Sequence, residues 1–314
     1  MAPRGFFDPN RDRRKRLRAA ARDALDRGVL PARIKHRLVS LARSERFTST
    51  LGAAGSLSAR AAGCEPIGIV SGTAVYHMMT VEATRMLAAF RNNIRFSWAT
   101  MGANVDGELT GISQAMDAMR LLAIQRLRDE AAVLGAHGVL GVQIRSRRLS
   151  ETLVEFALVG TAVRVDGHSR PQVPFTSLLG AQEFLMLKDA GYWPVELIFG
   201  ACCFTSTFYN NSIWGLAGGN REMSYATHAL RSAQRLARDR LAAACKRAGG
   251  HGVVGVSMAI RRHFRLSEDK RSKSWIAARA VAMGTAVVRE STPDPASRQL
   301  VLSLSDGSLR LSPR

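Results

Sequence analysis

The feature that most constrains this chain is an internal repeat. Three short motifs occur twice, in the same order, in two halves of the sequence. They occupy residues 47–53 and 175–181, residues 137–142 and 251–256, and residues 160–163 and 284–287. The first is Phe-Thr-Ser-x-Leu-Gly-Ala in both copies, and it recurs without a gap. A repeat of this length predicts two folded modules in tandem, so the function must be sought in what a pair of modules does.

The length and the composition agree with two domains. The 314 residues are enough for two domains of roughly 120 residues each, and 46% of the side chains are hydrophobic, which is typical of a globular protein. We therefore expect four parts. They are a basic amphipathic helical extension (1–46), a first module (47–168), a second module (175–290) and a C-terminal hairpin tail (291–314).

Each module is expected to contain a strand, a long helix and two further strands. Apolar residues recur at helical spacing from 115 to 127 and from 229 to 241, which predicts one buried face on each helix. Gly135 and Gly249 are expected to end these helices, because glycine accepts the left-handed conformation of a C-terminal cap. The expected strands are 66–76, 139–144 and 154–165 in the first copy, and 194–204, 253–260 and 275–288 in the second. The sequence therefore predicts an α+β fold.

Positive charge is concentrated near the N-terminus. The chain has 45 Lys and Arg against 25 Asp and Glu, a formal net charge of +20, and the first 46 residues carry a disproportionate share of it. Two amphipathic helices are expected there, 11–27 and another from Pro31, and the first contains the run Arg13, Arg14, Lys15 and Arg16. Such a segment suits an anionic membrane surface or nucleic acid. The alternative is a capping helix with a solvated basic face.

The cysteines and the apolar segments bear on location. The four cysteines sit at no zinc-ligand spacing and form no disulfide framework, which indicates small buried thiols in a reducing, cytoplasmic protein. Residues 197–220 carry no formal charge, but their glycines and asparagines make a transmembrane helix a poor interpretation. We therefore expect no transmembrane segment.

The last residues predict a separate small element. Leucines alternate with other residues before and after Asp306-Gly307. An Asp-Gly pair between alternating runs is a strong signal for a β-hairpin. Because an isolated hairpin is only marginally stable, we expect these leucines to dock on a module or on a neighbouring subunit.

Several of these motifs together resemble the YbjQ-like family, which carries a heavy-metal-binding label. The motifs are Gly-Thr-Ala-Val at 72–75 and 160–163, the helix end and strand at 134–142, and, in the second copy, Gly200, 248–256 and 284–287. The resemblance implies a dodecin-like β-α-β-β module that assembles into a five-membered ring. The Gly-Gly-Arg-Ser-x-x-Tyr-Glu stretch of the family survives only as an echo at Gly218, Gly219, Arg221 and Tyr225. We therefore carry over no ligand role for its acidic residue.

The repeated histidines are the candidate metal ligands. His137 and His251 both lie between the helix end and the second strand of their module. In a ring, one histidine per module would form a circle of nitrogens, which is a candidate site for a divalent metal or a pH sensor. The alternative is that each imidazole hydrogen-bonds a backbone group in a tight turn.

Basic residues near the hairpin between the last two strands are the second candidate site. Assembly would multiply them into a positive rim that contacts phosphates, since aromatic residues are only 6% of the chain and do not interleave with the cluster. The alternative is a solvated tip. The candidates are Arg145, Arg147 and Arg148 in the first copy and Arg261, Arg262 and Arg265 in the second.

No arrangement of residues typical of catalysis recurs in both copies. A Ser-His-Asp set, paired carboxylates, a Cys-His pair and a phosphate-binding loop are all missing from the repeated motifs. The sequence therefore predicts a non-enzymatic, cytoplasmic scaffold, and the resemblance to the YbjQ-like family implies that it forms a homo-oligomeric ring, for which we expect five chains. The alternatives are an adaptor that docks on anionic membrane or nucleic acid through the N-terminal segment, and a metal-binding ring through His137 and His251.

Overall fold

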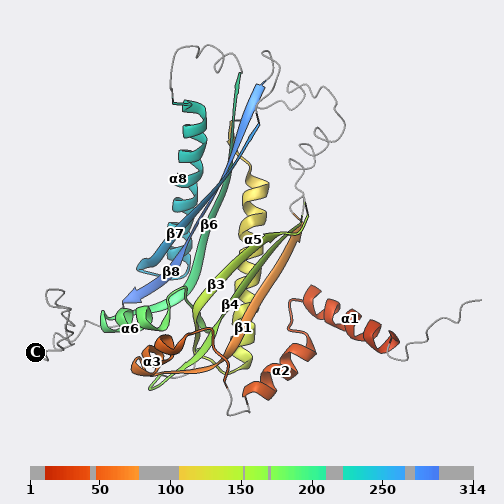
Figure 1. Ribbon diagram of the computed structural model, residues 1–314, viewed down its shortest axis with the longest axis vertical. Coiled ribbons are helices and arrows are strands. Elements are labelled where there is room, and N and C mark those ends of the chain that lie inside the picture. The colour runs from red at the N-terminus through yellow and green to blue at the C-terminus, as the bar shows by residue number, and fades with distance from the viewer. Residues whose placement is uncertain are drawn as a thin grey trace, which may run out of the picture.

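Two four-stranded sheets, each covered by a long helix, form the body of the protein in this computed structural model (Figure 1). The structure describes residues 11–42, 47–77, 106–150, 153–168, 171–209, 222–265 and 273–289. The predicted α+β class is confirmed. The predicted tail hairpin lies outside the described residues.

The described elements follow one another along the chain as labelled in Figure 1. They are α1 (Arg11–Asp26), α2 (Ala32–Ala42), α3 (Ala53–Ala61), β1 (Cys64–His77), β2 (Gly107–Glu108), α5 (Thr110–Val133), β3 (Gly138–Arg148), β4 (Leu153–Val165), β5 (Phe175–Thr176), α6 (Ala181–Asp189), β6 (Tyr192–Tyr209), α8 (Ser224–Arg247), β7 (Gly252–Arg265) and β8 (Lys273–Arg289).

The three long strands of the two sheets share one topology. The first has the order β1-β4-β3-β5 and the second β2-β6-β8-β7, and the three long strands of each are antiparallel. Each sheet takes its fourth, two-residue strand from the other half of the chain. β5 pairs in parallel with β3, and β2 pairs antiparallel with β6. The halves are therefore joined by backbone hydrogen bonds at two places.

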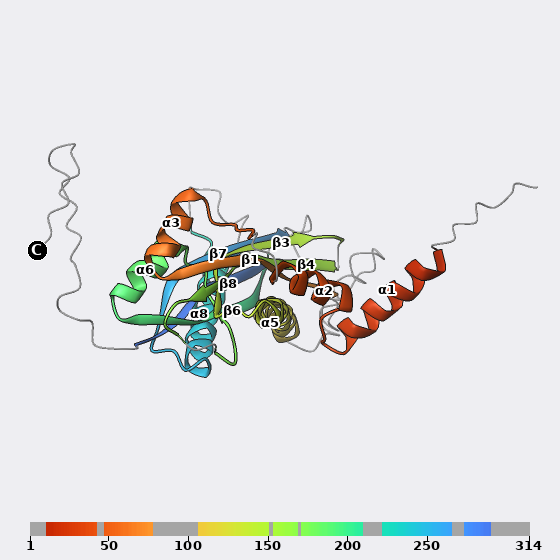
Figure 2. The ribbon, with the colours of Figure 1, turned by 90° about the horizontal axis from the view of Figure 1, so that it is seen from below.

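The long helices lie directly on their sheets. Figure 2 shows α5 and α8 on the same side of the strands. Gly72 of β1 and Gly200 of β6 face them, and a Cβ on either glycine would overlap the backbone of the helix, at Ala123 and Ala237 respectively. A helix can approach a sheet this closely only where the strand has no side chain in the way.

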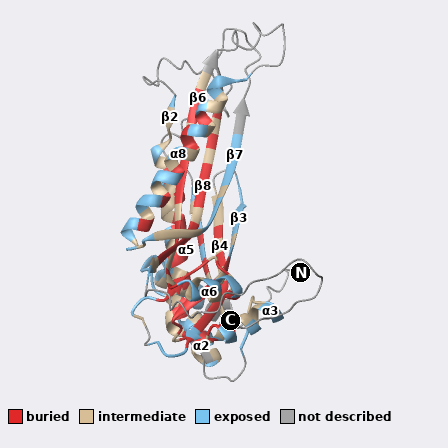
Figure 3. Ribbon diagram, turned by 90° about the vertical axis from the view of Figure 1, so that its left-hand side faces the viewer, coloured by how far each residue is buried: buried red, intermediate tan, exposed pale blue. Residues whose placement is uncertain are grey.

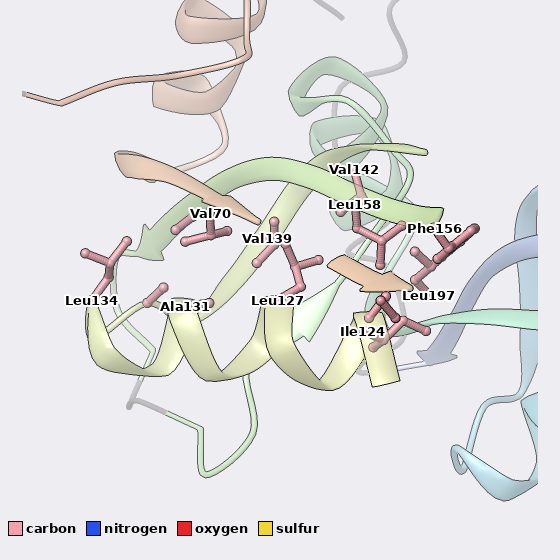
Figure 4. Close-up of a cluster of buried hydrophobic side chains, with 14 of the residues drawn as sticks. Val70, Ile124, Leu127, Ala131, Leu134, Val139, Val142, Phe156, Leu158 and Leu197 are labelled. Atoms are coloured by element: carbon pink, nitrogen blue, oxygen red, sulfur yellow. The ribbon is translucent and has the colours of Figure 1, made fainter. Parts of the chain in front are cut away.

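The predicted buried helix faces are confirmed. Met119, Ala123 and Leu127 of α5 are buried in the first core, and so are Ala233 and Ala237 of α8 in the second. The first core is rich in leucine, valine and phenylalanine and also takes in a leucine of β6 from the other half, as Figure 4 shows. The second core is built largely of alanines, which matches the close contact between α8 and its sheet.

The predicted helix stops are also confirmed. Gly135 and Gly249 follow α5 and α8 by two residues, and their φ angles are 72° and 70°. These are left-handed conformations, which residues with a Cβ adopt only under strain. The turn into the next strand therefore depends on a glycine in both halves.

The strands run further than the sequence indicated. β3 continues to Arg148, whereas apolar residues predicted an end near 144, because polar side chains on an exposed strand end give no periodic apolar signal. The second sheet is the taller one, since β6 has 18 residues against 14 in β1. Two nine-residue helices, α3 and α6, precede the first strand of each half and were not predicted.

The two predicted N-terminal helices are present and differ in their packing. α2 inserts Leu38, which is 1% exposed, into the first core, and Leu41 packs over Gly68 of β1. α1 leads away from the body (Figure 2), and its Leu17 and Leu25 are exposed. α2 thus caps the first half, whereas α1 presents both its apolar and its basic residues to solvent. Within the described part of the chain, no helix is long and apolar enough to cross a membrane.

Candidate functional site

The repeated histidines hold the ends of the last strands in place. His137 is buried, and its Nδ1 accepts a hydrogen bond from the backbone N–H of Val165 at 2.9 Å. His251 is exposed, and its Nδ1 accepts a hydrogen bond from the backbone N–H of Arg289 at 3.0 Å. Because Nδ1 is the acceptor in both rings, a neutral imidazole carries its proton on Nε2. Each imidazole thus hydrogen-bonds a backbone group, which is the role that we gave above as the alternative to metal binding.

A metal at these histidines needs further ligands. Structural zinc sites use four protein ligands and catalytic sites use three. Among the residues that the structure describes, no three His, Cys, Asp or Glu side chains are grouped so that they could hold a metal ion. Metal binding through His137 and His251 therefore stays a prediction, and it requires ligands from elsewhere.

The four cysteines are free and buried. Burial is the main cause that raises the pKa of Cys64 to about 11 and the pKa of Cys202 to about 12. The thiolate is the reactive form of cysteine, so thiols with these pKa values are protonated and poorly nucleophilic near neutral pH.

The predicted basic residues of the two hairpins lie on strands of different sheets. Arg145, Arg147 and Arg148 are exposed at the end of β3, where Arg147 is opposite Glu155 of β4. Arg261 and Arg262 are exposed on β7, and the side chain of Arg265 lies outside the description. A single chain therefore presents two basic patches, and their union into a rim depends on assembly.

The basic run of the N-terminal extension lies on α1. Lys15 and Arg16 are exposed, while the side chains of Arg13 and Arg14 lie outside the described part of the structure. Because α1 leads away from the body (Figure 2), these charges are accessible to a large anionic surface.

The joint between the halves is formed by the repeated Phe-Thr-Ser segment. Residues 175–179 run along the outer edge of β3 and are bound to it through backbone hydrogen bonds. The donor and acceptor pairs are Phe175 N to His137 O (3.1 Å), Ser177 N to Val139 O (2.9 Å), Val142 N to Ser177 O (3.0 Å) and Gly141 N to Leu179 O (2.8 Å). The segment thus acts as an added strand that seals the edge of the first sheet.

The same segment is anchored to the second sheet by side chains. The backbone N–H of Leu178 donates to Oγ1 of Thr285 at 3.0 Å, and the backbone N–H of Leu197 donates to Oγ1 of Thr176 at 3.0 Å. The backbone N–H of Leu179 donates to Oγ of Ser177 at 3.0 Å, which fixes the turn into α6. Residues 175–179 therefore lie between the two sheets and bind both.

An aromatic cluster fills the space under this joint. The ring of Phe175 stacks on Phe184 of α6 at 5.8 Å, and Trp193 of β6 meets both rings edge-on. Ala59 and Ala62 from the first half complete the cluster. The joint is thus a hydrophobic interface between the halves as well as a strand addition.

The corresponding edge of the second sheet is open. β7 is its outermost strand and pairs only with β8 among the described elements. Figure 3 shows β7 as exposed along most of its length, and Val256 and Ile260 are 55% and 40% exposed. On the equivalent strand β3, whose edge the added segment covers, Val139, Leu140 and Val142 are buried.

A pocket of about 490 Å³ lies at the start of this open edge. Gly252 forms part of it, and a Cβ on Gly252 would have no neighbour closer than 3.8 Å. The lining residues are Tyr192, His251, Gly252, Val253, Val254, Val287 and Arg289. Most of the lining is apolar, so the pocket suits a hydrophobic group better than a charged ligand.

Buried charges form a second contact between the halves, which sequence patterns did not indicate. Arg120 of α5 is 6% exposed, and its Cζ lies 5.3 Å and 5.7 Å from the ring centroids of Phe156 and Phe199. Burial lowers the pKa of Arg120 to about 10, and Asp117 opposes this shift. A buried guanidinium that contacts two aromatic rings, one of them on β6, fixes the position of α5 against β6.

Two ion pairs accompany Arg120. Nη1 of Arg128 on α5 lies 2.8 Å from Oε1 of Glu196 on β6, and Nη1 of Arg240 on α8 lies 2.6 Å from Oε1 of Glu108 on β2. The signal that could have found the first pair is Glu196, because a charge on an otherwise apolar strand requires a partner. Both pairs join elements from different halves.

Comparison with known proteins finds relatives of this chain. A Mycobacterium tuberculosis protein named as an encapsulin nanocompartment protein is 32% identical over 227 residues, an alignment that covers 68% of this chain and 78% of that protein. The YbjQ family model, described as "Putative heavy-metal-binding", matches residues 64–166. The chain belongs to the YbjQ-like family.

Other YbjQ-like relatives match a shorter stretch. A UPF0145 protein of Halalkalibacterium halodurans is 37% identical over 62 residues, which is 20% of this chain and 58% of that protein. A UPF0145 protein of Saccharolobus solfataricus is 37% identical over 71 residues, which is 23% of this chain and 62% of that protein. The chain thus spans about three fifths of the length of these two relatives.

Proposed function

We propose that this YbjQ-like protein is a non-enzymatic scaffold that assembles with copies of its own chain into a ring. Residues 47–168 and 175–290 are in this proposal two dodecin-like modules. The observation that carries it is the open edge of β7, where Val256 and Ile260 are exposed although the equivalent edge of β3 is covered. An exposed apolar edge strand is a surface that pairs with another chain. The name of the M. tuberculosis relative, an encapsulin nanocompartment protein, supports an assembly role.

The number of chains in the ring is part of the proposal. The family resemblance implies a five-membered ring of single modules, whereas each chain here supplies two. A closed single-layer ring of whole chains therefore holds an even number of modules, and the five chains that the sequence predicts would place ten modules in it. Other closed rings have masses that differ by whole chains of 34.1 kDa.

Light scattering coupled to size-exclusion chromatography tests the assembly. We expect one discrete species whose mass is a multiple of 34.1 kDa and does not change over a hundredfold range of concentration. A mass of 34.1 kDa at micromolar concentration would overturn the proposed function. Electron microscopy of the same peak would count the chains.

A second candidate, favoured by the relative that covers most of the chain, is association with an encapsulin shell. Co-expression with an encapsulin shell protein should then yield particles that retain this chain through density-gradient centrifugation. Removal of residues 291–314, whose leucines we expect to dock on another protein surface, is the first variant to compare. A chain that stays outside the shell in both forms would reject this role.

We further propose that α1 lets the assembly dock on an anionic surface in the cytoplasm. The exposed Lys15, Arg16, Arg18 and Arg22 on a helix that leads away from the body support the docking, and the four free thiols support the reducing compartment. Deletion of residues 1–26 should abolish salt-sensitive binding to anionic vesicles or to DNA. Binding that survives the deletion would contradict this role of α1.

A further inference from the structure

We propose that residues 47–51 of one chain add as a strand to the edge of β7 in a second copy of the chain, with Phe47 seated in the pocket beside Gly252. This inference rests on the proposed self-assembly and names the two surfaces that would meet. The joint inside the chain, where residues 175–179 cover β3, is its template.

The segment 47–51 is already held in the conformation of its counterpart. The backbone N–H of Thr50 donates to Oγ1 of Thr161 at 2.9 Å, as that of Leu178 does to Thr285 in the second half. The backbone N–H of Ile69 donates to Oγ1 of Thr48 at 3.2 Å, as that of Leu197 does to Thr176.

Within the described part of the chain, the backbone groups that pair in the template have no backbone partner in this segment. The backbone N–H of Leu51 donates to Oγ of Ser49 at 2.9 Å, and this bond reproduces the turn at Ser177. Among the described residues, the backbone N–H of Phe47, both backbone groups of Ser49 and the carbonyl of Leu51 make no hydrogen bond. These four are the counterparts of the groups at 175, 177 and 179 that bind β3.

The anchoring also excludes the β7 edge of the same chain as the partner. Residues 47–51 are fixed to the first sheet through Thr161 and Ile69, and β7 is the far edge of the second sheet. The segment that lies between the two sheets is 175–179, which already joins them. If a segment 47–51 occupies the edge of β7, it therefore comes from another molecule.

The exposed fractions of two residue pairs indicate that the segment 47–51 and the edge of β7 belong to one interface. Phe47 is 52% exposed, whereas Phe175 is 5% exposed. Val256 of β7 is 55% exposed, whereas Val142 of β3 is 5% exposed. In both pairs the residue of the template is buried and its equivalent is exposed, which is the pattern expected when a repeated contact lacks its partner.

Most of the pocket at Gly252 corresponds to the site that holds Phe175. In the first half a Cβ on Gly138 would overlap the Phe175 ring, whereas the space over Gly252 is empty of neighbours to 3.8 Å. Five of the seven lining positions are identical or both aliphatic in the two halves: His137, Gly138, Val139, Leu140 and Val163 against His251, Gly252, Val253, Val254 and Val287. A benzyl side chain is thus the group that this pocket is shaped to accept.

One difference adds a specific contact. Arg289 stands in the second half where Val165 stands in the first. In the intermolecular joint its guanidinium would lie beside the ring of Phe47, an arrangement that favours an aromatic side chain over an aliphatic one.

This contact uses different surfaces on the two molecules. A head-to-tail contact of this kind closes into a ring when the rotation per chain divides a full turn, and otherwise extends as a filament. The rotation that relates the two halves within the chain would be repeated between chains.

Two substitutions on opposite sides of the joint test it. Phe47→Asp places a charge in an apolar pocket, and Gly252→Leu fills that pocket in a position where the isolated chain has room and φ is not left-handed. We expect each to reduce the assembly to 34.1 kDa chains, or to raise the concentration for half-dissociation at least tenfold, with an unchanged circular dichroism spectrum. Leu121→Asp, on the exposed face of α5, is the matched control and should leave the mass unchanged.

Cysteine trapping tests whether residue 47 of another chain lies in the pocket beside Gly252. A mixture of Phe47→Cys chains with Gly252→Cys chains should form disulfide-linked dimers under mild oxidation, and neither variant should do so alone. The double variant should form a ladder of linked chains. A double variant that links only within one chain would overturn the inference, because the segment would then have folded back on its own β7.

The outcomes separate this inference from the proposed function. If the wild-type chain is oligomeric and neither Phe47→Asp nor Gly252→Leu changes its mass, this joint is wrong and the assembly stands. If the wild-type chain is monomeric, both the proposed assembly and the proposed joint between chains are wrong.

Discussion

Phe175 lies over the backbone of Gly138 so closely that any side chain on the glycine would overlap the phenylalanine ring. Phe175 belongs to β5, at the start of the second half. Gly138 is the first residue of β3, directly after the helix-to-strand turn of the first half. The two residues therefore set the distance between the halves.

The joint predicts a large effect of Phe175→Ala on stability. Loss of a buried phenylalanine costs about 3–5 kcal/mol, and Phe175 also contacts Phe184 and Trp193. Phe47→Ala is the matched variant, since Phe47 is exposed in the isolated chain. Urea unfolding at a concentration where the chain is monomeric should show the large loss for Phe175→Ala alone. Equal losses would mean that Phe47 is also buried in the monomer.

The contact between helix and sheet predicts sensitivity at two glycines. Gly72→Ala and Gly200→Ala should each destabilise the fold by about 1–3 kcal/mol or more, because the added methyl group would push α5 or α8 away from its sheet. Gly107→Ala, where the structure shows open space, should change the unfolding free energy little. Thermal denaturation followed by circular dichroism measures all three. A Gly200→Ala variant as stable as wild type would contradict the close approach.

The histidine geometry predicts unequal effects of the same substitution. His137→Ala removes the acceptor of a buried backbone N–H, which costs about 1–3 kcal/mol, whereas the bond made by His251 is exposed to water, which replaces the lost acceptor. Unfolding free energies should therefore fall more for His137→Ala than for His251→Ala. Elemental analysis of the same proteins tests the metal hypothesis. Metal present in stoichiometric amount and lost from both variants would favour ligation over the structural role.

Asp117 predicts a pH dependence of stability. Burial is the largest cause that raises the pKa of Asp117, and it outweighs the lowering by Arg120. The folded state thus holds this proton more tightly than the unfolded state, so the contribution to stability is present at the unfolded pKa and below and is lost as the pH rises through the folded pKa. Relative to wild type, Asp117→Asn should therefore gain stability as the pH rises above the unfolded pKa. A difference that stays constant with pH would show that Asp117 is not buried as a carboxylate.

The elements that could be predicted from the sequence are those with a periodic or local sequence pattern. The faces of α5 and α8, the stops at Gly135 and Gly249, and the central strands all follow from spacing or from backbone conformation within a few residues. The helices α3 and α6 were missed because nine residues contain too few apolar positions to show a period. The polar strand ends at Arg148 and Arg265 were missed for the same reason.

The candidate site was less accessible to sequence reasoning. The repeated Phe-Thr-Ser segment was recognised as a motif, but its role as an added strand depends on pairing between residues far apart in the chain, which no local period reports. The histidines were recognised as a pair, but only the backbone geometry shows that Nδ1 is taken by Val165 or Arg289. The ion pairs of Arg128 and Arg240 required the packing of one half on the other.

The unequal strand lengths have a consequence for the outline of any assembly. β6 and β8 have 18 and 17 residues, against 14 and 13 in β1 and β4. At about 3.3 Å per residue, the second sheet stands about 13 Å taller than the first. In a ring of head-to-tail chains, tall and short sheets would then alternate along one border. The order of its rotational symmetry would equal the number of chains, which is half the number of sheets. A partner that contacts that border would therefore find one binding site per chain.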